Sequence, residues 1–514
     1  MACDATVGWP EDVNGVYSVV IDLDDRPANV RWSPESLARA VEGRLLRAGT
    51  RPIATAFIDS RTPRADALFV PIVAARDGHD FIMAAAAAGA SATLVARGRQ
   101  LPTEGAAADL TVVEVEDTLA ALSKLGQDVR AGIGGPVVAI TGSNGKTTTR
   151  AFIEAALATG YGPVLCTRGN FNNHLGVPLT LVDEPHDPAA AVLELGMSAP
   201  GENDHLARIV APSVHVITSI ALEHLEFMGS LEAIAAAEAE PIAHLRAGTD
   251  GRPPLLVVPG DEPLLLPHLP GPDSGIEVLR FGRANAGEAG TLDIEILEVE
   301  VGERTRALLG LGGGERLQLS LQTFGAHNAR NAAAAVAVAR HLGLPLKPVA
   351  EALEAVVPVG DRGRVRECEG RLLIADCYNA NPGSMIAALD SLALLRAGRG
   401  GPLVAVLGDM LELGPDELQL HADMGAHAAA LGIDAVLGFG PRTRALVDAA
   451  RAGGVVAEHL EADEAGVEAA AAWVRDRLAA GGAALFKASR GIRLERVMAK
   501  VEAEGFDSAG VPAR

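Results

Sequence analysis

A glycine-rich turn between a short apolar strand and a helix is the feature that most constrains this chain. Residues 137–140 (VVAI) have the composition of a buried strand, and residues 148–159 have the pattern of a helix. The loop that joins them, Thr141 to Thr148, is TGSNGKTT. Glycines let backbone N–H groups surround phosphate oxygens, and a helix N-terminus favours negative charge. The segment therefore predicts an α/β domain that binds a nucleoside triphosphate.

The side chains of this loop suit that chemistry. Lys146 is expected to reach the β- and γ-phosphates, and the Thr147 hydroxyl to ligate Mg²⁺. The spacing is G-x-x-G-K-T, with Ile140 at the position where the longer form of the motif has its first glycine. The chain has only five lysines, so a lysine inside a motif is informative. The predicted ATP-binding residues of the loop are Thr141, Gly142, Ser143, Asn144, Gly145, Lys146, Thr147 and Thr148.

Composition and charge restrict the class of protein further. The 514 residues include 44 basic and 66 acidic side chains, for a formal net charge of −22. Nucleic acid and anionic membranes need basic patches, so neither is expected as a partner. The sequence shows no signal peptide, no apolar membrane span and no disulfide framework in its four cysteines. We therefore expect a cytoplasmic protein, and we take it to be a monomer.

The length predicts three domains, at about 150 residues each. Gly/Pro-rich segments at 131–136 and 358–363 mark two boundaries. The predicted divisions are an N-terminal extension (1–32) and domains at 33–133, 134–357 and 358–514. In the last domain, strands and helices alternate from Arg371 to Phe486, which predicts a mostly parallel sheet covered on both faces.

Three further local predictions concern secondary structure. Residues 33–46 (SPESLARAVEGRLL) read as one helix with Ser33 as its cap. The proline-rich stretch 253–272 reads as a connection between strands, and 291–321 reads as antiparallel hairpins.

Polar side chains cluster after other predicted strands of the middle domain. Glu194 ends the strand at 191–195, where a carboxylate lies near the phosphate loop and suits Mg²⁺. His224 follows the strand at 214–218. The segment 167–178 contains Asn170, Asn172 and Asn173, which favour either polar recognition or a capped turn.

Two more groups complete the candidate site. Asn328 and Asn331 are three residues apart on one helix face, where they can bond an adenine edge or cap the helix. In the last domain, Asp376, Asp409 and Lys487 each follow a strand of one parallel sheet. Polar residues at neighbouring strand ends of such a sheet predict one wall of a binding site.

Together these segments resemble the Mur ligases, the ATP-dependent amide-forming enzymes of peptidoglycan precursor synthesis. The resemblance runs from about Ser33 to Arg496 and implies three α/β domains: a UDP-binding domain, a P-loop ATPase-like domain and a Rossmann-like domain. The segments that carry it are DSRTPRADALFV (59–70), DGHDFI (77–82), TGSNGKTT (141–148), GNFNNHLGVPLTL (169–181), HLEFMGSLEAIA (224–235), GAHNARNAAAA (325–335), DCYNANPGSM (376–385), VLGDMLELG (406–414) and KASRG (487–491).

The resemblance implies roles by matching position. Thr147 and Glu194 would bind one Mg²⁺ and His224 a second, while Asn328 and Asp376 would contact the nucleotide. One arginine of the RGR stretch would also reach the nucleotide, and the sequence leaves Arg362 and Arg364 open. The residues that would contact the two other substrates are Ser60, Arg61, Asn170, Asn172, Asn173, Tyr378, Asn379, Asn381, Lys487 and Arg490.

One departure from the family concerns Glu238. The family has a lysine there that reacts with CO₂ to form a carbamate near the second Mg²⁺. This chain has no lysine between Lys146 and Lys347. We expect Glu238 to supply the negative charge instead, as a metal ligand or through a bridging water. A smaller departure is Ala488, where the family usually has glycine.

Within the family, YNANP and LGDMLELG favour the branch that adds D-alanyl-D-alanine to UDP-N-acetylmuramoyl-tripeptide. The expected reaction uses ATP and Mg²⁺ and passes through an acyl phosphate. Two alternatives stay open: a sister ligase with another amine substrate, and a catalytically silent paralogue that binds nucleotide.

Overall fold

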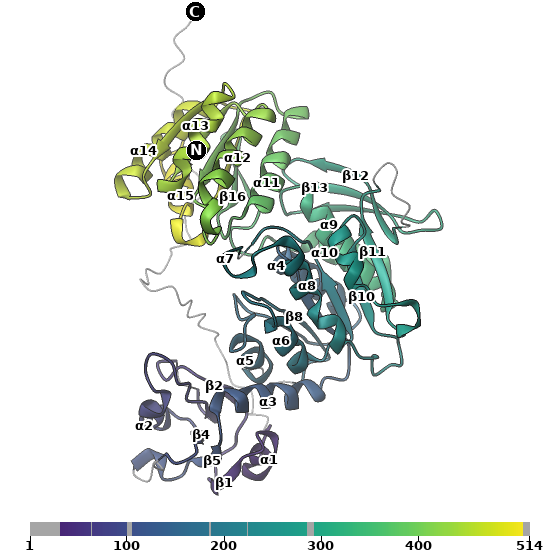
Figure 1. Cartoon of the computed structure of the whole chain (residues 1–514), viewed down its shortest axis with the longest axis vertical. Helices are drawn as coiled ribbons and strands as arrows, with labels where there is room; N and C mark the ends of the chain where they lie inside the picture. The colour runs from purple at the N-terminus through teal and green to yellow at the C-terminus, as the bar shows by residue number, and fades with distance from the viewer. Residues whose placement is uncertain are drawn as a thin grey trace, which may run out of the picture.

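The computed structural model describes residues 31–62, 64–99, 105–183, 187–223, 225–284 and 292–506. Their strands form three sheets, which follow one another along the long axis of the molecule in Figure 1. Most of the predicted extension, and His224, lie outside the described residues. The predicted domain limits fall in the connections between the sheets and remain predictions.

The N-terminal sheet has five strands in the order β1-β5-β4-β3-β2. They are β1 (Arg44–Arg47), β2 (Thr55–Phe57), β3 (Ala67–Phe69), β4 (Ala92–Ala96) and β5 (Thr111–Val115), and the helices are α1 (Pro34–Ala40), α2 (Ile82–Ala87) and α3 (Thr118–Ala131). Strands β2 to β5 are parallel, and β1 is antiparallel to β5.

The prediction of one helix over 33–46 is wrong in its second half. Ser33 caps α1 as expected, with a reciprocal hydrogen bond to Ser36. The helix ends because Glu42 has a φ of 50°, and the chain turns back as β1. At the turn, a Cβ on Gly43 would lie 2.7 Å from the Glu114 carbonyl oxygen, so pairing with β5 requires glycine.

The central sheet has nine strands in the order β14-β13-β12-β11-β10-β9-β6-β8-β7. The strands are β6 (Val137–Thr141), β7 (Val164–Cys166), β8 (Ala190–Glu194), β9 (Val214–Ile217), β10 (Leu255–Pro259), β11 (Glu277–Gly282), β12 (Ile294–Val301), β13 (Thr305–Gly310) and β14 (Arg316–Leu321). The helices are α4 (Lys146–Ala158), α5 (Gly176–Asp183), α6 (Glu202–Val210), α7 (Leu225–Met228), α8 (Leu231–Ala239), α9 (His327–His341) and α10 (Leu346–Ala355).

Strands β6 to β12 are parallel, and β12, β13 and β14 form the predicted antiparallel hairpins. The reading of 253–272 as a connection is wrong, because it contains the buried strand β10. Its apolar run LLVVP is short, and the prolines around it favour a connection in a sequence-based prediction. In the structure, β10 pairs with β9 on one side and β11 on the other.

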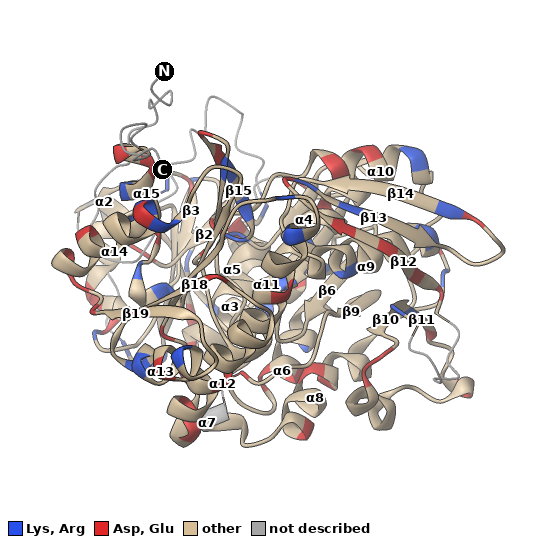
Figure 2. Ribbon diagram, turned by 90° about the horizontal axis from the view of Figure 1, so that it is seen from above, with Lys and Arg blue, Asp and Glu red and all other residues tan. Residues whose placement is uncertain are grey.

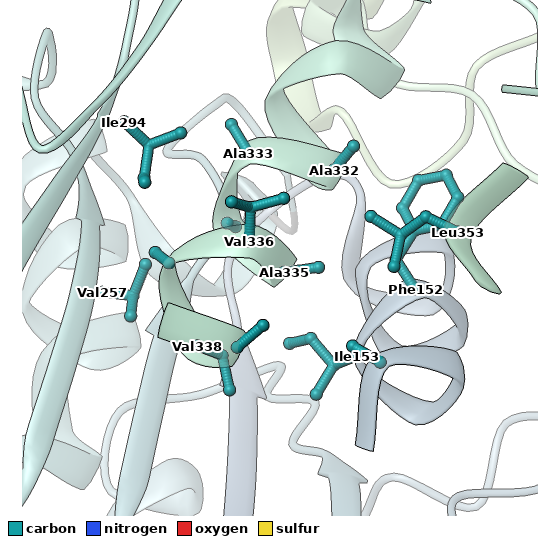
Figure 3. Packing of buried hydrophobic residues seen from close by; sticks show 14 of the residues in the cluster. Phe152, Ile153, Val257, Ile294, Ala332, Ala333, Ala335, Val336, Val338 and Leu353 are labelled. Carbon is teal, nitrogen blue, oxygen red and sulfur yellow. The ribbon is translucent and has the colours of Figure 1, made fainter. Parts of the chain in front are cut away.

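The core of the central domain lies between α9 and the strands and helices around it (Figure 3). Small side chains such as Ala332 and Ala335 let α9 lie close to α4, whose Phe152 and Ile153 are fully buried. Burying a side chain the size of Phe152 contributes roughly 1.5–3 kcal/mol. This packing holds the helix that starts at Lys146 against the sheet.

The C-terminal sheet has six strands in the order β15-β16-β20-β17-β18-β19, all parallel except β15. The strands are β15 (Arg364–Cys368), β16 (Arg371–Asp376), β17 (Leu403–Gly408), β18 (Ala435–Phe439), β19 (Val456–Leu460) and β20 (Ala483–Lys487). The helices are α11 (Pro382–Leu394), α12 (Glu417–Ala430), α13 (Arg444–Ala452), α14 (Glu464–Arg477) and α15 (Glu495–Glu504). The predicted alternation is confirmed, but two half-exposed edge strands, β15 and β19, lack the apolar runs that identify strands in sequence.

The surface carries the acidic excess of the composition. In Figure 2, acidic segments mark α6 and α8, and basic segments are scattered over the three domains. None of the described helices is long and apolar enough to cross a membrane.

Candidate functional site

The phosphate loop lies between β6 and α4, as predicted, and its shape depends on two glycines. Gly142 and Gly145 have φ angles of 115° and 91°. A Cβ on Gly142 would lie 2.2 Å from Thr218 Oγ1, and a Cβ on Gly145 would lie 2.5 Å from Asn331 Oδ1. Both positions therefore require glycine, because other residues would meet strain and a clash.

Glu194 lies at the end of β8, beside the start of α4. Its Oε2 accepts a hydrogen bond from Thr147 Oγ1 at 3.0 Å, and its Oε1 accepts one from Arg150 Nε at 3.0 Å. The carboxylate is almost fully buried. The structure thus brings together the two residues predicted to share a metal ion.

Lys146 is surrounded by carboxylates. Its Nζ donates to the Gly142 carbonyl within the loop. Burial alone would lower the pKa of the Lys146 ammonium, but the charges of Glu223, Glu238 and Glu194 outweigh it and raise that pKa. Lys146 is therefore charged at neutral pH, as phosphate binding requires.

Glu238, near the end of α8, is buried beside the phosphate loop. Its Oε2 accepts a hydrogen bond from Asn203 Nδ2 at 3.0 Å, and the Gly142 backbone and the Glu223 side chain are near enough to shift the pKa of its carboxyl group. Burial raises the pKa of the Glu238 carboxyl, and the neighbouring Glu223 carboxylate raises it further, although Lys146 opposes both. Glu223 and Glu238 therefore place two carboxyl groups near Lys146.

Glu223 and Asn203 were not predicted from the sequence. Glu223 adjoins the predicted His224, and its acidity was the only available signal; Asn203 comes from α6 and has no motif around it. The described residues contain no cluster of three or more His, Cys, Asp or Glu side chains arranged to hold a metal ion by themselves.

The asparagine-rich segment lies in the loop between β7 and α5. Asn173 Oδ1 accepts from the Gly176 backbone N–H at 2.9 Å, so Asn173 caps α5. The Asn172 carbonyl accepts from the Gly196 N–H at 2.8 Å, next to the strand end that carries Glu194. Asn170 is exposed.

Asn328 and Asn331, on α9, are both buried and bonded to each other. Asn331 Nδ2 donates to Asn328 Oδ1 at 3.0 Å, and Asn328 Nδ2 donates to the Phe324 carbonyl at 2.6 Å. Asn331 also lies against Gly145, so the pair supports the phosphate loop. Their contact with adenine remains a prediction.

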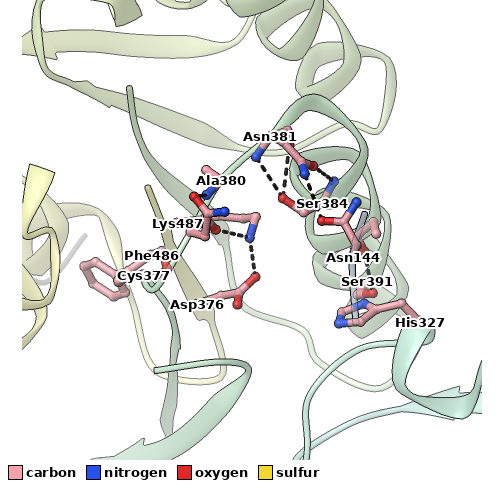
Figure 4. A network of polar contacts seen from close by, with 12 residues as sticks. Asn144, His327, Asp376, Cys377, Ala380, Asn381, Ser384, Ser391, Phe486 and Lys487 are labelled. Atoms are coloured by element: carbon pink, nitrogen blue, oxygen red, sulfur yellow. Dashed lines mark hydrogen bonds and ion pairs between the residues drawn. The ribbon is translucent and has the colours of Figure 1, made fainter. Parts of the chain in front are cut away.

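The C-terminal sheet contributes a second wall (Figure 4). Lys487 Nζ donates to Asp376 Oδ2 at 2.7 Å and to the Asn379 carbonyl at 3.0 Å. Lys487 is 2% exposed, so this pair is shielded from water. Asp409 is also buried, and it accepts from the backbone N–H of Arg442 at 3.0 Å.

Helix α11 joins this wall to the phosphate loop. Asn381 caps α11 through its Oδ1, which accepts from the Ser384 N–H at 2.8 Å, and its Nδ2 donates to Asn144 Oδ1 at 3.0 Å. Further along α11, Ser391 Oγ accepts from the Ala326 N–H at 3.2 Å. The C-terminal domain therefore contacts both the phosphate loop and the start of α9 (Figure 4).

Two arginines flank the ring of Tyr378. The Arg362 guanidinium lies 3.7 Å from the ring centroid and that of Arg490 lies 5.8 Å from it. Arg362 is near enough to Lys146 to lower its pKa, whereas Arg364 donates to the Pro358 carbonyl at 3.4 Å and its charge lowers the pKa of Glu502.

Ser60 and Arg61 lie in the N-terminal domain, in the loop after β2. Arg61 Nη2 bonds Asp59 Oδ2 at 2.7 Å, and its side chain is largely exposed. These two residues therefore belong to the N-terminal domain and not to the domain that carries the phosphate loop.

Comparison with known proteins adds independent evidence. The Mur ligase middle domain matches residues 140–339, and the Mur ligase glutamate ligase domain matches residues 361–490. The chain is 35% identical over 450 residues to the UDP-N-acetylmuramoyl-tripeptide–D-alanyl-D-alanine ligase of Bacillus subtilis (strain 168), covering 86% of this chain and 91% of that protein. The chain belongs to the Mur ligase family.

Solved structures agree with this assignment. The chain superposes on MurF from Acinetobacter baumannii with a TM-score of 0.79 at 28% identity, covering 92% of this chain and 98% of that one. MurF ligase from Thermotoga maritima in complex with ADP gives a TM-score of 0.74 at 28% identity, covering 88% and 97%. This Mur ligase therefore has the three-domain fold of the family and is an ATP-dependent ligase.

Proposed function

We propose that this Mur ligase joins D-alanyl-D-alanine to UDP-N-acetylmuramoyl-tripeptide, with ATP and Mg²⁺, in the cytoplasm and as a monomer. The observation that carries the proposal is the apposition of two walls. The phosphate loop and its carboxylates face the C-terminal residues Asp376, Arg362 and Lys487, with α11 in contact with both sides. The Bacillus subtilis relative supports the choice of substrates.

The reaction follows from the chemistry of a carboxylate. Its oxygen is a poor leaving group, so the γ-phosphoryl group of ATP is first transferred to it, giving ADP and an acyl phosphate. The amine of the dipeptide then attacks the acyl carbon, the C–O bond breaks, and phosphate leaves as the amide forms and the amine loses a proton. Because the first step brings two anions together, Lys146 and the N-terminus of α4 favour it by neutralising charge.

The donor set fits Mg²⁺, a hard cation that binds one or two carboxylates together with phosphate and water oxygens. Thr147 and Glu194 would hold one ion, and Glu238 and His224 would hold a second. Bound there, Mg²⁺ would neutralise the developing phosphate charge.

We propose that Glu238 supplies the anionic group that the family obtains from a carbamoylated lysine. Its carboxyl lies near Lys146 and the Gly142 backbone of the loop, since both lower its pKa. Activity independent of bicarbonate follows from this assignment.

Among the remaining residues, we propose Arg362 rather than Arg364 as the nucleotide contact, because the charge of Arg362 acts on Lys146 of the phosphate loop whereas that of Arg364 acts on Glu502. Asp376, Asn328 and Asn331 complete the proposed nucleotide contacts. Ser60 and Arg61 would bind the UDP-sugar in the N-terminal domain. Asn170, Asn172, Asn173, Tyr378, Asn379, Lys487 and Arg490 would line the path of the peptide and dipeptide.

The test is phosphate release from ATP with UDP-N-acetylmuramoyl-tripeptide and a set of amines, with the product mass measured. We expect release only when D-alanyl-D-alanine and the tripeptide are both present, and a product mass equal to their condensation. Release with another amine would identify a sister ligase. ATP binding without release under any combination would identify a silent nucleotide-binding paralogue.

A further inference from the structure

A buried histidine lies beneath the phosphate loop, where it has no part in the reaction described above. His215 is in the middle of β9, is fully inaccessible to solvent, and pairs across the sheet with Ala139 of β6. Its Nε2 lies 2.9 Å from Thr141 Oγ1. Its Nδ1 is buried and has no hydrogen-bond partner among the described residues.

The donor and acceptor in the hydrogen bond between His215 and Thr141 can be assigned from the Glu238 carbonyl, which is bonded to the same Thr141 hydroxyl. Thr141 Oγ1 lies 2.9 Å from the backbone carbonyl of Glu238, and a carbonyl can only accept. The single hydroxyl proton of Thr141 is therefore used on Glu238, so His215 Nε2 must carry a proton and donate to Thr141. His215 is then neutral, with Nδ1 as an unpaired acceptor, which agrees with the lowering of its pKa to about 3 by burial.

The carbonyl of Glu238 needs such a partner. It is one of the last carbonyls of α8, and the last carbonyls of an α-helix have no N–H donor within the helix. The neighbouring carbonyl of Ala237 accepts from Asn203 Nδ2 at 3.1 Å, and the same amide holds the Glu238 carboxylate. The backbone of Glu238 is thus held by Thr141, and its side chain by Asn203.

We propose that His215 is a positioning residue, which orients the Thr141 hydroxyl onto the Glu238 carbonyl and so holds the Glu238 carboxylate beside Lys146. This inference rests on the proposed role of Glu238 in the reaction. The relay links the last residue of β6 to the end of α8, which are 97 residues apart. Without the donor from His215, the hydroxyl of Thr141 can rotate away from the Glu238 carbonyl. The end of α8 then loses its hydrogen bond to β6.

The test compares His215→Leu, which keeps a similar volume, with His215→Gln, whose amide keeps a donor near the position of Nε2. Thr141→Val removes the hydroxyl at constant shape, and a double mutant His215→Leu/Thr141→Val completes a cycle. We expect kcat to fall on the order of tenfold in His215→Leu and Thr141→Val, because small displacements at a reaction site are costly. The double mutant should lose no more than either single mutant, and His215→Gln should recover most of the rate.

Two measurements separate this relay from general stability and from the proposed function. Nitrogen NMR of the wild-type imidazole should show a neutral ring protonated at Nε2, whether or not the ligase assay succeeds. Thermal unfolding of each variant reports any loss of folding. A protonated Nδ1, multiplicative losses in the cycle, or an unchanged kcat in His215→Leu would overturn the proposal. Failure of wild-type turnover with all substrates would instead overturn the proposed function.

Discussion

Asn381 of the C-terminal domain donates a hydrogen bond to Asn144 of the phosphate loop, with 3.0 Å between Nδ2 and Oδ1. The two residues are 237 positions apart in sequence. Gly383, two residues later, lies against Ala221, and a Cβ there would come within 2.9 Å of the Ala221 Cβ. The first turn of α11 therefore sits directly on the loop that would hold the phosphates.

This contact can be removed without removing the helix cap. In Asn381→Ser, the serine oxygen still caps α11, but it is too short to reach Asn144. We expect the free energy of unfolding, measured with urea, to change by less than about 0.5 kcal/mol, since serine and asparagine cap helices about equally well. We expect kcat to fall on the order of tenfold, because the two domains lose a contact that assembles the site. Asn381→Ala is the matched control, and should in addition lose about 1 kcal/mol of stability with the cap. Wild-type kcat in Asn381→Ser would show that the contact does not support turnover.

The proposed role of Glu238 predicts how activity responds to bicarbonate. Wild-type turnover should be the same in CO₂-free buffer and in buffer with added bicarbonate. Glu238→Gln, which keeps the shape and removes the charge, should lose on the order of a hundredfold in kcat, as expected when a charged group beside a phosphoryl-transfer site is lost. Glu238→Lys should regain activity only with bicarbonate. The assay is phosphate release at saturating substrates, and full activity of Glu238→Gln without bicarbonate would refute the assignment.

The raised pKa of Glu238 predicts a pH dependence of stability. Burial raises this pKa above its ordinary value of 4.5 in the folded chain, so the folded state binds the proton more tightly than the unfolded state. The resulting stabilisation is complete below the ordinary pKa and is lost as pH rises through the folded value. We expect Tm, measured without nucleotide or Mg²⁺, to fall more steeply between pH 5 and pH 8 in the wild type than in Glu238→Gln. Parallel pH profiles would contradict this.

The buried pair of Lys487 and Asp376 predicts a stability effect that depends on which partner is removed. Asp376→Asn leaves a charged ammonium almost without solvent, and we expect a loss of about 3 kcal/mol in the free energy of unfolding. Lys487→Met should cost less, because the Asp376 side chain is 19% exposed and water can reach it. The double mutant Asp376→Asn/Lys487→Met should be more stable than Asp376→Asn. Urea unfolding of the three variants measures these free energies of unfolding. Equal losses of stability in both single mutants would argue against an unpaired lysine as the cause.

Local sequence patterns were sufficient to predict secondary structure where a residue type has one dominant structural role. The glycines and Lys146 of the loop define strand, turn and helix together, and the alternation after Arg371 defines a parallel sheet, because connections of that length cross over the sheet. The same patterns failed where pairing outweighs local preference. Residues 44–46 continue a helical pattern but pair with β5, and β10 is bounded by prolines yet pairs with β9 and β11.

The sequence by itself therefore determined the type of fold, the phosphate loop and the family, since these depend on residues adjacent in the chain. It also predicted that Glu238 takes the place of the family's lysine. Only the tertiary structure decided which side chains meet: Glu223 and Asn203 around Glu238, His215 beneath Thr141, and Asn381 on Asn144. These contacts join separate strands and helices, and their geometry depends on how sheets and domains pack, which no local pattern encodes.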